Sequence, residues 1–188
     1  LLGNLENFTP EKSVEITQMP DLEKYMLGKV SSLNTELKQL VGNHDYHGIY
    51  VKLLNFCTID LSAFYFDIRK DSLYCDSITS NKRKSVSTTL HILFEFLTKW
   101  LSPVISFTTE EAWLSRKYNN KNSILTETIK NNDFVYENAL QDNFNELKRV
   151  RKSVTASLEL KRNEKVIGSS LQANVKLYLS AKTQEILK

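Results

Sequence analysis

Two short clusters in this sequence contain side chains that could take part in acid–base catalysis or bind a metal. The first, His44-Asp45-Tyr46-His47, places two imidazoles three residues apart beside a carboxylate. Two histidines supply only part of a ligand set, and no further cysteine or histidine cluster completes it. The second, Glu110-Glu111, belongs to a predicted helix start. We interpret the first cluster as helix capping and surface polarity, and we predict no catalytic residue and no metal ligand in this chain.

Basic side chains offer a different chemistry, the binding of phosphate groups. The formal net charge is +3, but residues 1–50 carry seven acidic and four basic side chains, so the rest of the chain carries +6. This positive charge is concentrated in residues 69–99 and 148–165. Such a bias does not prove nucleic-acid binding, but it locates the candidates. The candidate phosphate-binding residues are Lys82, Arg83, Lys84, Arg69, Lys70, Lys148, Arg149 and Lys152.

The cluster Lys82-Arg83-Lys84 lies where we predict the N-terminus of a helix. Cations oppose the helix dipole there, at a cost of roughly 0.3–1 kcal/mol each when exposed. A bound phosphate would compensate this charge, since helix N-termini bind anions. Alternatively, Asp71 and Asp76 offset the charge, or the helix begins later. The sequence leaves these alternatives open.

The second basic cluster lies on a predicted amphipathic helix over residues 138–163. On a helical wheel Lys148, Arg149 and Lys152 fall away from the apolar stripe that Phe144, Leu147, Val154 and Leu158 form. They form either a solvated face or a strip that follows a nucleic-acid backbone.

These candidates must be positioned by helices, because a chain of 188 residues with only 5 Gly and 3 Pro has few turn-forming residues. Residues 1–19 look irregular. Apolar spacing then predicts a helix from Asp21 to Gly42, a second from Asp45 to Cys57 and a third that Asp60 caps, the last two being separate or one kinked helix. Residues 76–81 read as a loop and 118–137 as irregular. Further helices are predicted over 82–101, over about nine residues from a capping box of Thr108 and Glu111, and over 138–163.

Residues 174–179 alternate polar and apolar side chains with a period of two, which predicts a β-strand. One strand cannot satisfy its own edges, so we interpret it as the start of a second small domain. No stretch approaches 18 consecutive apolar residues, so we expect no membrane span and no membrane partner. The sequence gives no indication of an extracellular location. We therefore expect the two cysteines, Cys57 and Cys75, to be reduced thiols in a cytoplasmic protein.

An aromatic run, Phe64-Tyr65-Phe66 with Tyr74, has two interpretations. Aromatic residues at helical spacing usually bury their area against neighbouring helices. The rival interpretation is a stacking platform for unpaired bases.

Longer motifs around these aromatics resemble a known family. The run DLSAFYFDIRKD from Asp60, followed by Leu73-Tyr74-Cys75, is similar to the DLSAFY(L/F)D…KDRLYC signature of isoleucyl-tRNA synthetases, with Ser72 in place of the usual arginine. The segment Pro103 to Trp113 resembles the APILPFTAEEAW motif shared with the synthetases for valine, leucine and methionine. The HIGH-like and KMSKS-like signatures that handle ATP in this family do not occur in these 188 residues.

The resemblance implies a mainly α-helical bundle of the class I anticodon-binding type that binds the anticodon stem and loop of tRNA(Ile). It implies that residues 1–19 connect to catalytic domains of the same polypeptide, that 20–165 form the anticodon-binding domain, and that 166–188 begin a small α+β C-terminal junction domain. For the parent ligase it implies ATP, and in many members zinc; this chain alone should need no cofactor and be non-catalytic. Two alternatives remain open: the sister valyl-tRNA synthetase, or a helical protein-interaction module without an RNA role.

Overall fold

The computed structural model describes residues 1–6, 8–116, 122–129, 134 and 137–187. Helices make up the regular structure of this part of the chain, so the prediction of a mainly α-helical fold is confirmed. Contacts divide the chain into two compact units, Leu1–Tyr136 (unit 1) and Glu137–Lys188 (unit 2). The predicted domain division at residues 19 and 165 stays a prediction, because a compact unit and a functional domain need not share boundaries.

Unit 1 begins with three single 3-10 turns, η1 (Leu2–Leu5), η2 (Pro10–Lys12) and η3 (Ile16–Gln18), where the sequence predicted irregular structure. Leu5, Phe8 and Met19 from this segment are buried, which ties it to the helices that follow. The first of these, α1, spans Asp21–Gly42 as its apolar spacing predicted.

One continuous helix over 46–74 follows and answers the question that the sequence left open. It consists of α2 (Tyr46–Asn55), η4 (Phe56–Phe66), which has wider π-helical turns, and α3 (Asp67–Tyr74). Asp45 caps its N-terminus by accepting a hydrogen bond from the Gly48 amide. The predicted cap at Asp60 is wrong: Asp60 lies inside the helix, and its carboxylate is 3.8 Å from the Lys29 ammonium on α1.

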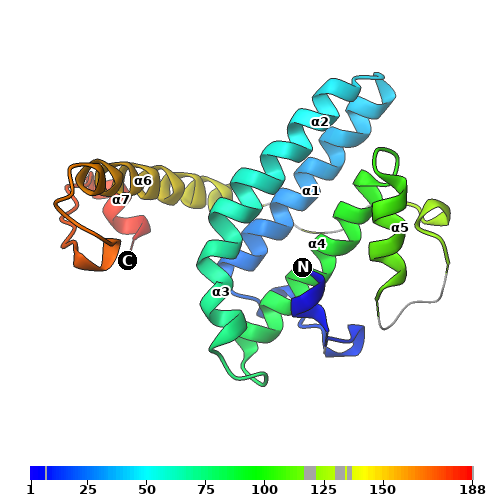
Figure 1. Cartoon of the computed structure of the whole chain (residues 1–188), viewed down its shortest axis with the longest axis horizontal. Helices are drawn as coiled ribbons and strands as arrows, with labels where there is room; N and C mark the ends of the chain where they lie inside the picture. Colours follow the sequence, from blue (N-terminus) through cyan, green and yellow to red (C-terminus); the bar gives the residue numbers. More distant parts are fainter. Residues whose placement is uncertain (7, 117–121, 130–133, 135–136, 188) are drawn as a thin grey trace. The chain divides into compact units, whose positions relative to one another are not determined.

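The core of unit 1 lies where α1, the 46–74 helix and α4 (Asn81–Leu101) pack together (Figure 1). The Tyr25 and Phe64 rings meet edge to face, with centroids 6.2 Å apart, and Phe56 meets Trp100 in the same way at 6.1 Å. Trp100 also donates a buried hydrogen bond to the Asn34 amide oxygen. The helix stripe predicted over 82–101 therefore forms a core face, because its apolar side chains fill the space between the other two helices.

The helix α5 (Ser106–Leu114) has the predicted nine residues, but its predicted capping box is wrong. The helix begins at Ser106, two residues before Thr108, and no side chain caps it. Glu110 instead accepts hydrogen bonds from the Ile124 amide and the Ser123 hydroxyl, which holds η5 (Ile124–Thr126) against α5. Glu110 thus has a structural role. Of the segment predicted to be irregular over 118–137, residues 118–121, 130–133, 135 and 136 lie outside the described part.

The 46–74 helix is long and apolar enough to cross a membrane when judged by length and composition alone. One face of it supplies Leu53, Phe56, Leu61, Phe64 and Tyr65 to the core of unit 1. This packing accounts for part of the apolar composition of the helix, while Tyr50, Leu54 and Ile59 are exposed. The expectation that the chain has no membrane partner stays a prediction.

Unit 2 contains the long helix α6 (Asn138–Asn163), the single turn η6 (Ser170–Gln172) and the short helix α7 (Ala181–Ile186). The helix predicted over 138–163 is confirmed. The strand predicted over 174–179 is wrong for this chain: these residues belong to no helix or sheet, since the described residues offer no neighbouring strand.

Candidate nucleic-acid interface

Unit 1 contains a cleft of about 480 Å³ beside the basic cluster at residues 82–84. Its walls come from the N-terminal segment, the end of α3, the following loop and the first turns of α4. Residues from all four elements line it: Gly3, Asn4, Glu6, Phe8, Lys12, Leu73, Tyr74, Ile78, Thr79, Arg83, Lys84 and Ser87. The cleft therefore combines cations, two aromatic rings and apolar side chains.

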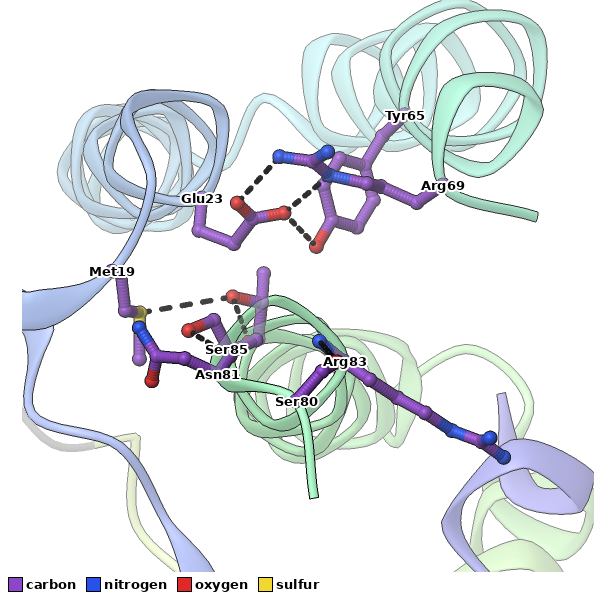
Figure 2. A network of polar contacts seen from close by, with 9 residues as sticks. Met19, Glu23, Tyr65, Arg69, Ser80, Asn81, Arg83 and Ser85 are labelled. Atoms are coloured by element: carbon purple, nitrogen blue, oxygen red, sulfur yellow. Dashed lines mark hydrogen bonds and ion pairs between the residues drawn. The ribbon is translucent and has the colours of Figure 1, made fainter. Parts of the chain in front are cut away.

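The helix start at this cleft was correctly predicted, and Ser80 caps it. The Ser80 hydroxyl accepts a hydrogen bond of 3.1 Å from the Arg83 amide (Figure 2). The Arg83 guanidinium donates to the carbonyl oxygen of Asp76 at 2.7 Å, which fixes the loop between α3 and α4. Arg83 is thus partly committed to the fold, although its charge remains in the cleft wall.

Lys82 and Lys84 differ from Arg83 because both are exposed and form no ion pair with a residue that the structure describes. Lys12 reaches the same cleft from η2. One carboxylate, Glu6, also lines the cleft. Three cations against one anion leave this surface positive, which suits a phosphate backbone.

The aromatic residues predicted either as core or as a stacking platform separate into two groups. Phe64 and Tyr65 are buried, Tyr65 has no exposed surface, and Phe66 is half-buried. Tyr74 is 73% exposed and lines the cleft. Among these residues the structure therefore leaves Tyr74 as the ring that can stack on an unpaired base.

Arg69 does not belong to this surface, although it was a candidate. Its Nε and Nη2 donate to the two carboxylate oxygens of Glu23, both at 2.7 Å, and Glu23 has no exposed surface (Figure 2). Tyr65 donates to the same carboxylate at 3.2 Å, and burial raises the pKa of its hydroxyl well above the usual range. This pair joins α1 to α3 across the core, so Arg69 serves the fold. Its neighbour Lys70 is exposed and pairs with Asp67 at 3.0 Å.

The candidates on α6 belong to unit 2 and have different surroundings. Arg149 forms a bidentate pair with Glu146 at 2.9 and 2.7 Å, and Thr183 of α7 donates to the same carboxylate. The hydrogen bonds from Arg149 and Thr183 lower the pKa of Glu146 to about 2. Lys148 is half-buried, whereas Lys152 is exposed. A groove of about 650 Å³ lies between α6 and α7 beside this pair.

The cluster from His44 to His47 lies in the turn between α1 and α2 and in the first residues of α2. Asp45 caps α2 as expected. No group of three or more His, Cys, Asp or Glu side chains within the described ranges could hold a metal ion.

Sequence reasoning missed the part that the N-terminal segment plays in the cleft. Residues 1–19 were predicted to be a connection, yet Asn4, Phe8 and Lys12 line the cleft. Lys12 is 71 residues before Arg83 in the chain, so no local pattern brings the two together. Tertiary packing of the buried Leu5 and Phe8 does so.

Comparisons with known proteins identify the family of the chain. A family model described as the anticodon-binding domain of tRNA ligase matches residues 23–177. The isoleucine–tRNA ligase of Pelagibacter ubique is 44% identical over the whole chain, that of Gluconobacter oxydans 39% over 96% of it, and that of Bacillus cereus 35% over the whole chain. The chain spans only 21%, 19% and 21% of these relatives, respectively. The chain therefore belongs to the family of anticodon-binding domains of tRNA ligases.

Proposed function

We propose that this chain binds the anticodon arm of an isoleucine tRNA through the cleft of unit 1, within an isoleucine–tRNA ligase. The observation that carries the proposal is an exposed aromatic ring, Tyr74, in a cleft lined by Lys12, Arg83 and Lys84. An anticodon arm offers phosphates along its stem and unstacked bases in its loop. Cations suit the first and an aromatic face suits the second.

We assign the phosphate contacts to Lys82 and Lys84, because both are exposed in the first turn of α4. Arg83 has a mixed role, since it also holds the Asp76 carbonyl. Lys70, Lys148, Arg149 and Lys152 remain secondary candidates. The bidentate pair of Arg149 with Glu146 leaves this guanidinium less available than the amines of Lys82 and Lys84.

In the parent ligase this domain supplies binding energy and orientation, so that the acceptor end of the tRNA reaches a distant active site. We assign the ATP-dependent chemistry to catalytic domains of the same polypeptide outside these 188 residues, because the ATP-handling signatures do not occur here. The chain alone is then non-catalytic and needs no cofactor; a parent zinc site would also lie outside it. We place the parent in the cytoplasm, where tRNA is charged.

Substitution of Tyr74 tests the base-stacking part of the proposal in the full-length ligase. Loss of one base–aromatic stack costs about 1–3 kcal/mol, so Tyr74→Ala should weaken binding of isoleucine tRNA roughly 5- to 150-fold. Tyr74→Phe keeps the aromatic face and should bind nearly as well as the unchanged protein. Filter binding or fluorescence titration at fixed salt measures both.

The matched control is Tyr46→Ala, because Tyr46 is a comparably exposed tyrosine at the other end of the 46–74 helix. It should leave tRNA affinity unchanged. Equal losses in Tyr74→Ala and Tyr46→Ala, or no loss in either, would remove Tyr74 from the RNA site. Binding that does not depend on salt in any variant would favour a protein-interaction module instead.

A further inference from the structure

The N-terminal segment of unit 1 packs on α4 and forms one side of the cleft. Its described residues 1–6 and 8–14 are called the N-terminal wall below. The Val14 amide donates a hydrogen bond of 3.1 Å to the Thr88 hydroxyl on α4. One turn farther along α4, the His91 ring meets the Phe8 ring with centroids 5.2 Å apart. The position of the wall therefore depends on contacts with one helix, and His91 is the titratable residue in these contacts.

The contact between Phe8 and His91 is largely shielded from water. Phe8 is 7% exposed, and the His91 side chain is 12% exposed. Among the described residues, the cleft lining includes Phe8 but not His91, whereas Asn4 and Lys12 of the wall line the same cleft as Tyr74. His91 is thus placed to act on the cleft through Phe8 without touching a bound RNA.

The charged groups around His91 act on its protonation in opposite directions. The Glu95 carboxylate, one turn farther along α4, is 4.0 Å from His91 Nε2 and favours the charged ring. The Arg116 guanidinium, which follows α5, is 3.3 Å from the same carboxylate oxygen and disfavours a second cation. From the wall, Glu6 and Lys12 line the cleft with opposite charges. Burial has the largest effect, and with Arg116 it lowers the pKa of His91 below its ordinary value of 6.5.

We propose that His91 is a positioning residue of the cleft, whose neutral ring holds Phe8 and the N-terminal wall on α4 and whose protonation releases the wall. A charged ring would gain from the Phe8 ring face and from Glu95. Release of the wall hydrates this charge, and burial makes hydration the larger effect. The consequence for RNA rests on the function proposed above: a released wall carries Asn4 and Lys12 away from the cleft.

The direction of the pH dependence follows from proton uptake. The pKa of His91 is lower with the wall in place than in the unfolded chain, so the contribution of His91 to docking is fully present above pH 6.5. It is lost as the pH falls from 6.5 through the folded-state pKa. Uptake of one proton weakens docking by at most about tenfold per pH unit within this window, and no further loss occurs below it.

Hydrogen–deuterium exchange of the full-length ligase tests the proposal, when it is resolved to single amides and corrected for the intrinsic effect of pH on exchange. The Val14 amide reports docking directly, because its hydrogen bond crosses from the wall to Thr88 on α4. Its protection should fall by a factor of about 3 to 10 between pH 7.5 and 5.5. Amides in the middle of α1 should keep their protection and serve as the reference for a folded sample.

Three variants assign the effect to His91. His91→Phe keeps an aromatic ring beside Phe8 but takes up no proton, so the protection of Val14 should not change between the two pH values. His47→Phe is the matched control, because His47 is exposed in the first residues of α2, and here Val14 should respond as in the unchanged protein. Phe8→Ala keeps His91 and removes its partner, so Val14 should exchange faster at both pH values.

Constant protection of Val14 between pH 7.5 and 5.5 in the unchanged ligase would overturn the proposal. A rise in protection at pH 5.5 would also overturn it, since the charged ring would then gain more from Phe8 and Glu95 than it loses by burial. An equal fall in His91→Phe would exclude His91 as the group that titrates.

Titration with isoleucine tRNA at pH 7.5 separates this proposal from the function on which it rests. Phe8→Ala should weaken binding roughly 2- to 10-fold, the equivalent of one lost hydrogen bond from the displaced wall. Weaker binding by Tyr74→Ala together with unchanged binding by Phe8→Ala would overturn the positioning role of the wall. Unchanged binding by both variants would instead count against the proposed function, and the exchange of Val14 would still decide whether His91 holds the wall.

Discussion

Each unit of this chain contains a bidentate arginine–glutamate pair of nearly the same geometry, and the two pairs differ in burial. In unit 1, Arg69 binds Glu23 with both contacts at 2.7 Å, and Glu23 has no exposed surface. In unit 2, Arg149 binds Glu146 at 2.9 and 2.7 Å on an exposed helix face. The first pair is enclosed by a hydrophobic core and joins two helices, whereas the second joins two residues of one helix at the surface.

The same contrast extends to the apolar side chains. Unit 1 buries large apolar residues from every one of its helices, among them Tyr25, Leu61, Leu90 and Trp113. The described residues of unit 2 bury only two polar side chains, Gln141 and Thr183, while Leu160, Leu171 and Tyr178 are largely exposed. Unit 1 therefore has a hydrophobic core, whereas the described residues of unit 2 bury no large apolar side chain.

Removing the cation from each pair should give the largest difference between the units. Arg69→Met leaves the Glu23 carboxylate buried without a cation, and this should cost about 3–5 kcal/mol of unfolding free energy. Arg149→Met removes a pair that solvent screens and should cost only a small fraction of that loss. Urea denaturation followed by circular dichroism measures both. A loss for Arg149→Met as large as that for Arg69→Met would refute the contrast.

Leucine-to-alanine substitutions compare the apolar packing in the same way. Leu90 is buried between the helices of unit 1, so Leu90→Ala should cost about 2–5 kcal/mol. Leu177 is half exposed in unit 2, so Leu177→Ala in the 188-residue chain should cost less than about 1 kcal/mol. Thermal and chemical unfolding of the two variants provide the comparison. Equal costs would show that unit 2 has a core of its own.

A smaller effect should appear when the pH is lowered, and it should be confined to unit 2. The folded-state pKa of Glu146 is about 2, below its ordinary value of 4.5, so its bonds to Arg149 and Thr183 stabilise the fold above pH 4.5. This contribution should be lost as the pH falls from 4.5 to 2, and α7 should loosen from α6. Amide exchange of α7 across this range measures it. Thr183→Val serves as the control, since it removes the contact between Glu146 and α7 at every pH. If the amide exchange of α7 changes by the same amount between pH 4.5 and 2 in Thr183→Val, Glu146 is not the cause of the change.

The sequence predicted most of this fold because helix periodicity is a local property. The bounds of α1 and α6 came from apolar spacing and stop signals, whereas the nine-residue length of α5 was predicted from a capping box that the structure does not contain. The helix start near Lys82 was also readable, and Ser80 supplies its cap. Two predicted helix caps, Asp60 and Thr108, are wrong, because both residues lie inside helices. Packing against α1 decides the bounds of the helix that contains Asp60. The path of the chain around α5 decides the bounds of the helix that contains Thr108.

The candidate site was less predictable, because its parts are far apart in the sequence. Charge alone could not distinguish Lys82 and Lys84, which are exposed, from Arg69, which a buried carboxylate holds inside the core. Aromatic spacing likewise did not separate Tyr65 from Tyr74. The strand pattern at 174–179 was read correctly as a pattern, but a strand needs a neighbour, and the described residues supply none.

The salt dependence of tRNA binding by Lys82→Gln/Lys84→Gln tests the central claim, that the cleft of unit 1 binds the phosphates of an anticodon arm. In the full-length ligase, the double substitution should reduce the slope of log affinity against log salt by about 2, since each lost phosphate contact on a duplex stem removes about 0.9. The control Lys24→Gln/Lys52→Gln makes the same change of charge at two lysines of unit 1 that pair with Asp21 and Glu36, and it should leave the slope unchanged. An unchanged affinity and slope in Lys82→Gln/Lys84→Gln would contradict the claim and direct the search for the RNA surface to Lys148 and Lys152.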